Sequence, residues 1–141
     1  MKKLFGLAVL SVLVMLAVPA AAQDTIKIGG VEPLSGTFKD IGERYLEGVQ
    51  YAAKVINESG GLLGKKVEVI PIDSELKPDV ATRKAQNLIL RDGVKFFCGG
   101  TGSSVGAAMA QLAEKQNVIM FTYGMDASSM TGEKCNKNFF R

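Results

Sequence analysis

The stretch that decides the fold is residues 94–121, VKFFCGGTGSSVGAAMAQLAEKQNVIMF. The apolar run 94–98 leads into a glycine-rich turn, and small apolar residues then recur at helical spacing as far as Gln116. A second apolar run, 118–121, follows directly. Two short buried strands joined by a helix predict a parallel pair with a right-handed crossover.

The same alternation extends toward the N-terminus. Residues 26–31 and 67–72 read as buried strands, and both are followed by turn-forming residues. Between them, Asp40 and Glu43 form a helix-start capping pattern ahead of a helix that ends at the turn 57–61. The apolar positions at helical spacing are Ile41, Tyr45, Val49, Ala52, Ala53 and Ile56.

A further helix is predicted between Pro78, which suits a first turn, and Gly93, which suits a C-terminal stop. Its apolar face contains Val80, Ala81, Ala85, Leu88 and Ile89. The fold class is therefore α/β, a doubly wound parallel sheet with helices on both faces. Ligands bind outside the carboxyl ends of such strands, which here carry the loops 32–40, 73–78, 99–104 and 122–129.

The chain has 141 residues, 47% of them hydrophobic and 22% charged, which suits one globular domain. It contains no histidine, so Ser-His-Asp and Cys-His nucleophile pairs and histidine zinc sites are excluded. Its 17 basic residues exceed its 14 acidic ones, but two of the lysines lie in the N-terminal segment. Without that segment the charge is near zero, which gives nucleic-acid binding no support.

Residues 1–22 have the layout of a secretory signal peptide. Two lysines precede the apolar run 4–18, and Ala20 and Ala22 occupy the −3 and −1 positions of a cleavage site. The alternative is a membrane anchor, but the run is shorter than the roughly 20 residues that span a bilayer. We expect export to the periplasm and a mature chain beginning at Gln23 or Asp24.

Cys98 and Cys135 are the two cysteines, and their separation excludes a CxxC metal or redox motif. In an oxidising compartment they can form a disulfide. The alternative is that Cys98, at the end of an apolar run, is a buried free thiol. Sequence alone does not supply the Cα separation that would decide between the two.

Ser103 and Ser104 stand where a helix follows the glycine-rich turn. The spacing fits neither a P-loop nor a dinucleotide fingerprint. Free backbone N–H groups and the helix dipole at such a place favour an anion, and a serine hydroxyl adds a donor. We therefore expect a small carboxylate ligand there, with capping of the helix by Ser103 or Thr101 as the alternative.

The other loops offer fewer groups. Ser35 can supply a hydroxyl, although Ser-Gly is a common turn. Asp126 could meet a ligand ammonium group, and Tyr123 could form an apolar wall with a polar tip. Asp73 reads as a turn-forming or capping acid. With no base near Ser103, and no lysine at S-x-x-K spacing from Ser103 or Ser104, we expect no catalytic residues, no metal and no cofactor.

The mature chain resembles the N-terminal lobe of type I periplasmic binding proteins. It is most similar to the branched-chain amino acid (Leu/Ile/Val) binding proteins of ABC transporters. The positions that carry the resemblance are Pro33, Leu34, Ser35, Gly36, Gly42, Gly48, Ile56, Asn57, Gly60, Gly61, Gly64, Asp73, Pro78 and 99–104.

The resemblance implies roles for individual residues. Ser103 matches the serine that binds a ligand α-carboxylate, and Gly124 matches a position whose carbonyl accepts from the α-ammonium group. Asp126 replaces a threonine that contacts the amino acid, and Ile41 replaces an aromatic residue. Leucine-binding members also carry a disulfide at the positions of Leu76 and Gly102, which cannot form here.

The resemblance further implies a receptor that captures a small solute between two lobes and delivers it to a membrane permease. Residues 23–141 would be the N-terminal lobe of a partial sequence, since the second lobe is absent. A ligand-sensing receptor domain of the same fold is the alternative function. A serine hydrolase is disfavoured, and contact with the membrane is expected only through the permease.

Overall fold

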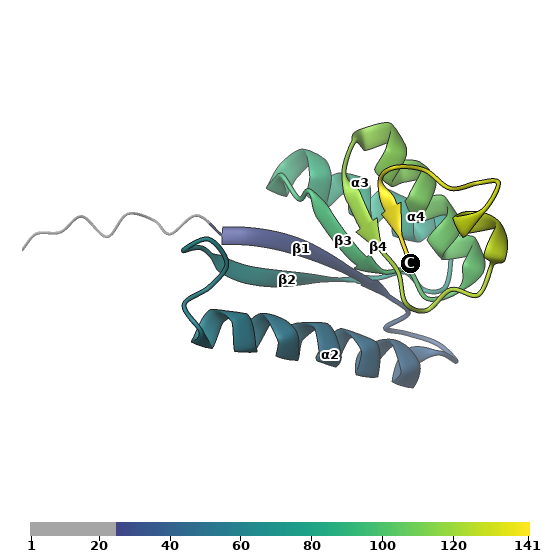
Figure 1. Ribbon diagram of the computed structural model, residues 1–141. Helices are drawn as coiled ribbons and strands as arrows, with labels where there is room; N and C mark the ends of the chain where they lie inside the picture. The colour runs from purple at the N-terminus through teal and green to yellow at the C-terminus, as the bar shows by residue number, and fades with distance from the viewer. Residues whose placement is uncertain (1–24) are drawn as a thin grey trace, which may run out of the picture.

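The computed structural model describes residues 25–141, which form a five-stranded sheet in the order β2-β1-β3-β4-β5 (Figure 1). Every neighbouring pair is parallel, which confirms the predicted α/β class. Helix α2 lies on one face, and α3 and α4 lie on the other. The elements are β1 (Thr25–Glu32), α2 (Lys39–Glu58), β2 (Lys66–Asp73), α3 (Pro78–Asp92), β3 (Phe96–Gly99), α4 (Ser103–Gln116), β4 (Ile119–Phe121), η1 (Ser128–Thr131) and β5 (Phe139–Phe140).

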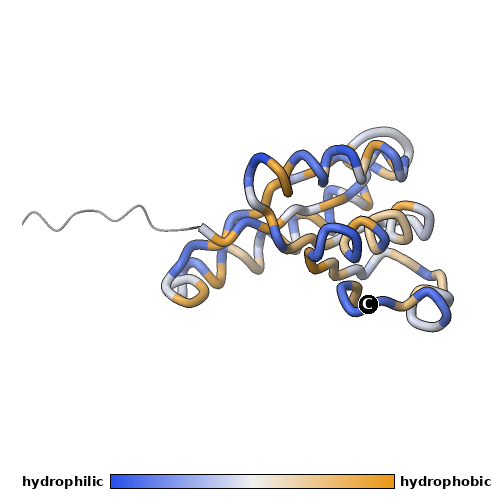
Figure 2. Tube along the Cα trace, turned by 90° about the horizontal axis from the view of Figure 1, so that it is seen from above, coloured by the Kyte–Doolittle hydropathy of each residue, from blue (hydrophilic) through white to orange (hydrophobic). Residues whose placement is uncertain are grey.

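The main hydrophobic core lies between the sheet and helices α3 and α4. Val31 of the central strand, Phe97 of β3 and Met120 of β4 are almost fully buried in it. Hydrophobic and hydrophilic residues alternate along the turns of the helices, as amphipathic packing requires (Figure 2). The predicted apolar face of α3 is confirmed: Val80, Ala81, Ala85 and Ile89 are buried, and Leu88 is half-buried.

The start of α2 corrects one prediction. The helix begins at Lys39, its N-cap residue is Phe38, and no side chain caps it. Asp40 instead lies within the first turn, where a negative charge interacts favourably with the helix dipole. The predicted pairing of Asp40 with Glu43 as a capping pattern is therefore wrong.

The buried face of α2 agrees with the predicted one only in part: Ala53 is buried, as predicted, and Val49 is half-buried. Ile41 and Tyr45 are 45% and 40% exposed, while Gly42 and Leu46 are buried. The reason is a close approach of the helix to the loop after β1: a side chain at Gly42 would collide with the backbone carbonyl of Pro33. Only glycine allows this contact, and it rotates the helix so that Ile41 faces outward.

Half of the sheet face on the α2 side has no helix over it among the described residues. Phe96, Phe121 and Phe140 are 39%, 49% and 48% exposed there, and the last two stack at 5.2 Å. Phe140 belongs to β5, a strand that the sequence patterns did not predict. A cavity of about 300 Å³ separates this region from α2, lined by Ile26, Ile28, Val49, Leu62, Phe96, Phe97, Cys98 and Phe121.

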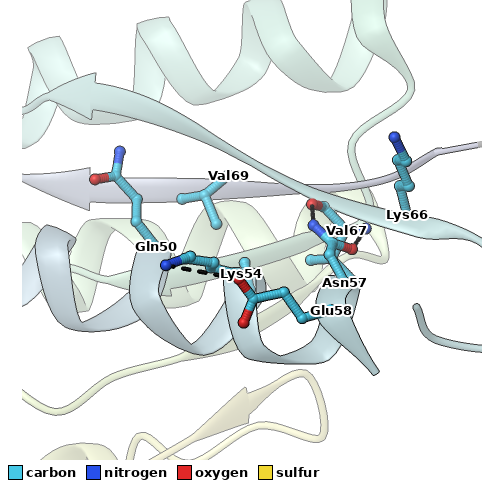
Figure 3. A pocket seen from close by; sticks show the side chains of 8 residues that line it. Gln50, Lys54, Asn57, Glu58, Lys66, Val67 and Val69 are labelled. Carbon is cyan, nitrogen blue, oxygen red and sulfur yellow. Dashed lines mark hydrogen bonds and ion pairs between the residues drawn. The ribbon is translucent and has the colours of Figure 1, made fainter. Parts of the chain in front are cut away.

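Asn57 closes part of the outer edge of β2 (Figure 3). Its side-chain amide donates to the Val67 carbonyl and accepts from the Val67 N–H, both at 2.8 Å. Pro71, farther along the same strand, has no N–H to offer. The edge strand is thus protected against pairing with another chain.

We predict that Asn57→Ala lowers the free energy of unfolding by about 1 to 3 kcal/mol, because it leaves the Val67 backbone without its partner. Urea denaturation checks this value. Gln50→Ala is the matched control, since Gln50 lines the same groove on α2 and forms no hydrogen bond with the edge strand. If the two variants are equally stable, the hydrogen bonds between Asn57 and the Val67 backbone do not stabilise the folded protein.

Candidate functional site

The N-terminus of α4 lies at the carboxyl edge of the sheet. Gly102 is the N-cap residue, and Ser103 and Ser104 are the first two helical residues. Both serines are exposed, and no side chain caps the helix. Neither Ser103 nor Thr101 therefore acts as the cap, so both serine hydroxyls and the first amides of the helix are available to an anion.

The loop after β4 is bound directly to this helix start. The Gly102 N–H donates to the Gly124 carbonyl at 2.9 Å, and Met125 packs against Gly106 in the first turn of α4. A side chain at Gly124 would lie 2.5 Å from the Thr101 hydroxyl oxygen, so glycine is needed for the approach. The structure thus brings Gly124 to Ser103. The Gly124 carbonyl keeps one lone pair for a second donor.

Asp126 follows two residues after Gly124 on the same loop, and its side chain is exposed. The loop after β2 also reaches this region, because the Leu76 side chain packs against Gly102. The two positions that the resemblance paired as a disulfide in leucine-binding members therefore lie side by side here.

Ser35, in the loop after β1, lies beside Asp73. The Asp73 carboxylate accepts from the backbone N–H groups of Leu34 and Glu75, both at 2.9 Å. Burial acts to raise the pKa of Asp73, but these bonds, the Ser35 hydroxyl and the charge of Lys84 together hold it below its usual value. Asp73 is thus a turn-forming acid, as predicted, and Ser35 helps to stabilise it.

Sequence reasoning missed Glu32, the last residue of β1. Its side chain is fully buried, and neither carboxylate oxygen has a hydrogen-bond partner. Burial raises the pKa of Glu32, and the nearby hydroxyls of Thr101 and Tyr123 oppose this only in part. An acid at the end of an apolar strand, directly before Pro33, was the available signal.

Tyr123 connects this buried acid to the protein surface. Its ring meets the ring of Tyr45 edge to face at 5.2 Å and is 44% exposed. Burial of its hydroxyl, followed by the charge of Glu32, raises its pKa. With residues of α2 it lines an apolar groove of about 440 Å³, which fits the predicted apolar wall with a polar tip. The lining residues are Arg44, Tyr45, Gly48, Val49, Ala52 and Tyr123.

Of the two alternatives for the cysteines, the structure has the free thiols, since Cys98 and Cys135 are not bonded to each other. Cys98 lies on β3 and lines the apolar cavity on the α2 side, while Cys135 is exposed in the segment between η1 and β5. Burial, followed by the charge of Glu32, raises the pKa of Cys98 to about 11. Cys98 is therefore a half-buried free thiol, close to the alternative that the sequence offered.

Two general features complete the description. Within residues 25–141, no helix is both long and apolar enough to cross a lipid bilayer. In the same part of the chain, no group of three histidine, cysteine, aspartate or glutamate side chains is placed to hold a metal ion. The proposed leader, residues 1–22, lies outside the described residues.

A family model described as periplasmic binding protein matches residues 25–141. The chain belongs to this family. Among curated relatives, the Leu/Ile/Val-binding protein homolog 4 of Brucella abortus (strain 2308) is 30% identical over 128 residues, which cover 86% of this chain and 30% of that protein. Proteins of this family are binding proteins, and the relatives that this chain matches include Leu/Ile/Val-binding proteins.

Solved structures of the family are similar as well. The branched-chain amino acid transporter substrate-binding protein LivJ of Streptococcus pneumoniae, in complex with isoleucine, matches with a TM-score of 0.76 and 28% identity over 83% of this chain and 33% of that one. A solute-binding protein of R. palustris in complex with 4-hydroxybenzoate matches with a TM-score of 0.71 and 27% identity, over 83% and 32%. The chain thus spans about a third of the length of the family members that it matches.

We predict that one thiol of the folded protein reacts quickly with Ellman's reagent at pH 8 and that the second reacts only after unfolding. The exposed Cys135 is the fast one, and the raised pKa of Cys98 keeps it protonated at that pH. Cys135→Ser should remove the fast phase. No reaction in the unfolded, unreduced protein would instead reveal a disulfide.

We also predict that Glu32→Gln stabilises the protein at pH 8. The folded-state pKa of Glu32 lies above its ordinary value of 4.5, so wild type gains stability as the pH falls through that folded pKa and has the full gain below 4.5. The advantage of the variant should therefore shrink as the pH falls toward 4.5. Denaturant unfolding at several pH values measures it, and a pH-independent difference would contradict the prediction.

Proposed function

We propose that residues 23–141 form the N-terminal lobe of a two-lobe receptor that captures a small amino acid and delivers it to an ABC transporter permease. The observation that carries the proposal is the start of α4, where the exposed Ser103 and Ser104 adjoin the Gly124 carbonyl. This arrangement offers donors for a carboxylate and an acceptor for an ammonium group within one small region.

Binding accounts for these groups better than catalysis does. Ser103 has no histidine to act as its base, because the chain contains none. The loops are held together by the backbone hydrogen bond from Gly102 to Gly124 and by the bond from the Leu34 N–H to the Asp73 carboxylate, which leaves the hydroxyls of Ser103 and Ser104 unused. Preformed loops with a few exposed polar groups are typical of a ligand site.

Two observations support a longer, two-lobe protein. The chain spans about a third of the length of its matched relatives. The aromatic half-face of the sheet, with Phe96, Phe121 and Phe140, offers an apolar surface against which further chain can pack. The layout of residues 1–22 supports export, so we place the receptor in the periplasm with its signal peptide removed.

The ligand class follows from the two kinds of group that the site offers: donors for a carboxylate and an acceptor for an ammonium group. The named specificities of the relatives, Leu/Ile/Val for the Brucella protein and isoleucine for LivJ, support a branched-chain or related amino acid. Asp126, where the resemblance has a threonine, adds a negative charge on the ammonium side. We propose Ser103, Ser104, Gly124 and Asp126 as the ligand-binding residues of this lobe, with Ser35 supporting the neighbouring loop.

A thermal-shift screen of the full-length protein tests the function. A ligand that binds only the folded state raises the melting temperature. We expect branched-chain amino acids to do so, while amides and aromatic acids serve as comparison classes. A shift with aromatic acids alone would move the proposal toward the specificity of the R. palustris neighbour, and no shift with any class would contradict capture of a small solute.

Ser103→Ala should weaken capture of an amino acid by about 1 to 3 kcal/mol, because it removes a hydroxyl donor to the ligand carboxylate. Isothermal titration calorimetry measures the affinity. Ser59→Ala is the matched control: this serine lies at the C-terminal end of α2 and its hydroxyl donates to the Val55 carbonyl. If both variants bind as tightly as wild type, Ser103 is no ligand residue.

A further inference from the structure

Glu32 is a buried acid that the fold does not explain. Its side chain is fully buried, its two oxygens have no hydrogen-bond partner, and the hydroxyl of neighbouring Thr101 is also buried and unpartnered. An unpartnered buried carboxylate is costly, so its presence calls for an explanation.

The contacts of Glu32 lead directly to the ligand loops. One of its carboxylate oxygens lies 2.5 Å from the position that a Cβ on Gly99 would take, which places it against the turn before α4. Thr101, near Glu32, lies against Gly124, since its hydroxyl oxygen is 2.5 Å from where a Gly124 Cβ would be. Thr101 thus lies between Glu32 and Gly124, whose carbonyl is the proposed acceptor for the ligand ammonium group.

We propose that Glu32 is a specificity-determining residue: a buried negative charge beneath Thr101 and Gly124 that favours ligands with an ammonium group and disfavours carboxylates without one. The inference rests on the proposed function, because it assumes that a ligand binds at the start of α4. The field of a charge shielded from water extends farther than that of an exposed one, so Glu32 acts without touching the ligand.

Other charges do not neutralise Glu32. Tyr123 and Cys98 on β3 bring no positive charge to Glu32, and burial raises the pKa of both, so they are uncharged at neutral pH. Asp73, in register with Glu32 on β2, is occupied by the amides of Leu34 and Glu75. The cation in the adjoining groove, Arg44 of α2, has an exposed side chain and is screened by water.

The test compares leucine with 4-methylpentanoate, which is leucine without its ammonium group. Affinities of the full-length protein for both are measured by calorimetry in wild type, in Glu32→Gln and in Glu114→Gln. Glutamine keeps the shape of the side chain and removes the charge. Glu114, exposed near the far end of α4, is the matched control for the loss of one charge.

The proposal expects changes of opposite sign. Glu32→Gln should bind leucine about tenfold more weakly and 4-methylpentanoate more tightly, while Glu114→Gln should match wild type. In wild type, the preference for leucine should change more with pH above 4.5, where Glu32 ionises, than it does in Glu32→Gln, where only the carboxyl of 4-methylpentanoate titrates. A structural role alone would weaken both ligands together and leave the pH profile in place.

Two negative results are distinguishable. If wild type binds neither compound, the proposed function is wrong for this ligand class and the inference is wrong with it. A second result overturns the inference alone: wild type binds leucine, but Glu32→Gln changes the affinities for leucine and 4-methylpentanoate in the same direction, or changes neither of them. Tyr123→Phe adds a second check: losing the hydroxyl that stabilises the ionised Glu32 should move the onset of the preference to higher pH.

Discussion

The parallel pairing of β1 with both β2 and β3 is the constraint on which the rest of this molecule depends. It places Glu32 in register with Asp73 on one side and Val31 in register with Gly99 on the other. Because the strands end at the same level, the loops that follow them meet at one edge of the sheet. Each crossover helix is then free to cover a face while the loops carry the polar groups.

Those loops are joined mainly through the backbone. The Gly102 amide bonds to the Gly124 carbonyl, and the Asp73 carboxylate holds the amides of Leu34 and Glu75. Backbone links of this kind tie the loops together without using the hydroxyls of Ser103 and Ser104. A rigid frame with unused side chains is suited to holding a small ligand, since little ordering is required when the ligand arrives.

Most of the fold could be predicted because its signals are local. Short apolar runs marked the first four strands, and Pro78 and Gly93 marked both ends of α3. The inward face of α2 could not be predicted, since apolar residues lie on two of its sides and the contact of Gly42 with Pro33 chooses between them.

The site was predictable to the extent that it follows from the ends of strands. Ser103, Ser104 and Gly124 came from loop positions and from the family resemblance, and the structure brings them together. Glu32 was missed because its burial depends on Thr101 and Tyr123, which the chain supplies from two distant loops. The separation of Cys98 from Cys135 is equally a product of the whole fold, since one lies on a strand and the other after η1.

Because the edge at β2 is closed, further strands can be added to the sheet at one edge only. Asn57 occupies the outward backbone groups of Val67, and Pro71 lacks a donor, so addition of a strand on that side is blocked at two points. At the opposite side, β5 presents only Phe139 and Phe140, beyond which the sheet is open within the described residues. A further strand can therefore pair with this sheet only at the β5 edge. Unwanted pairing with a strand of another molecule is confined to the same edge.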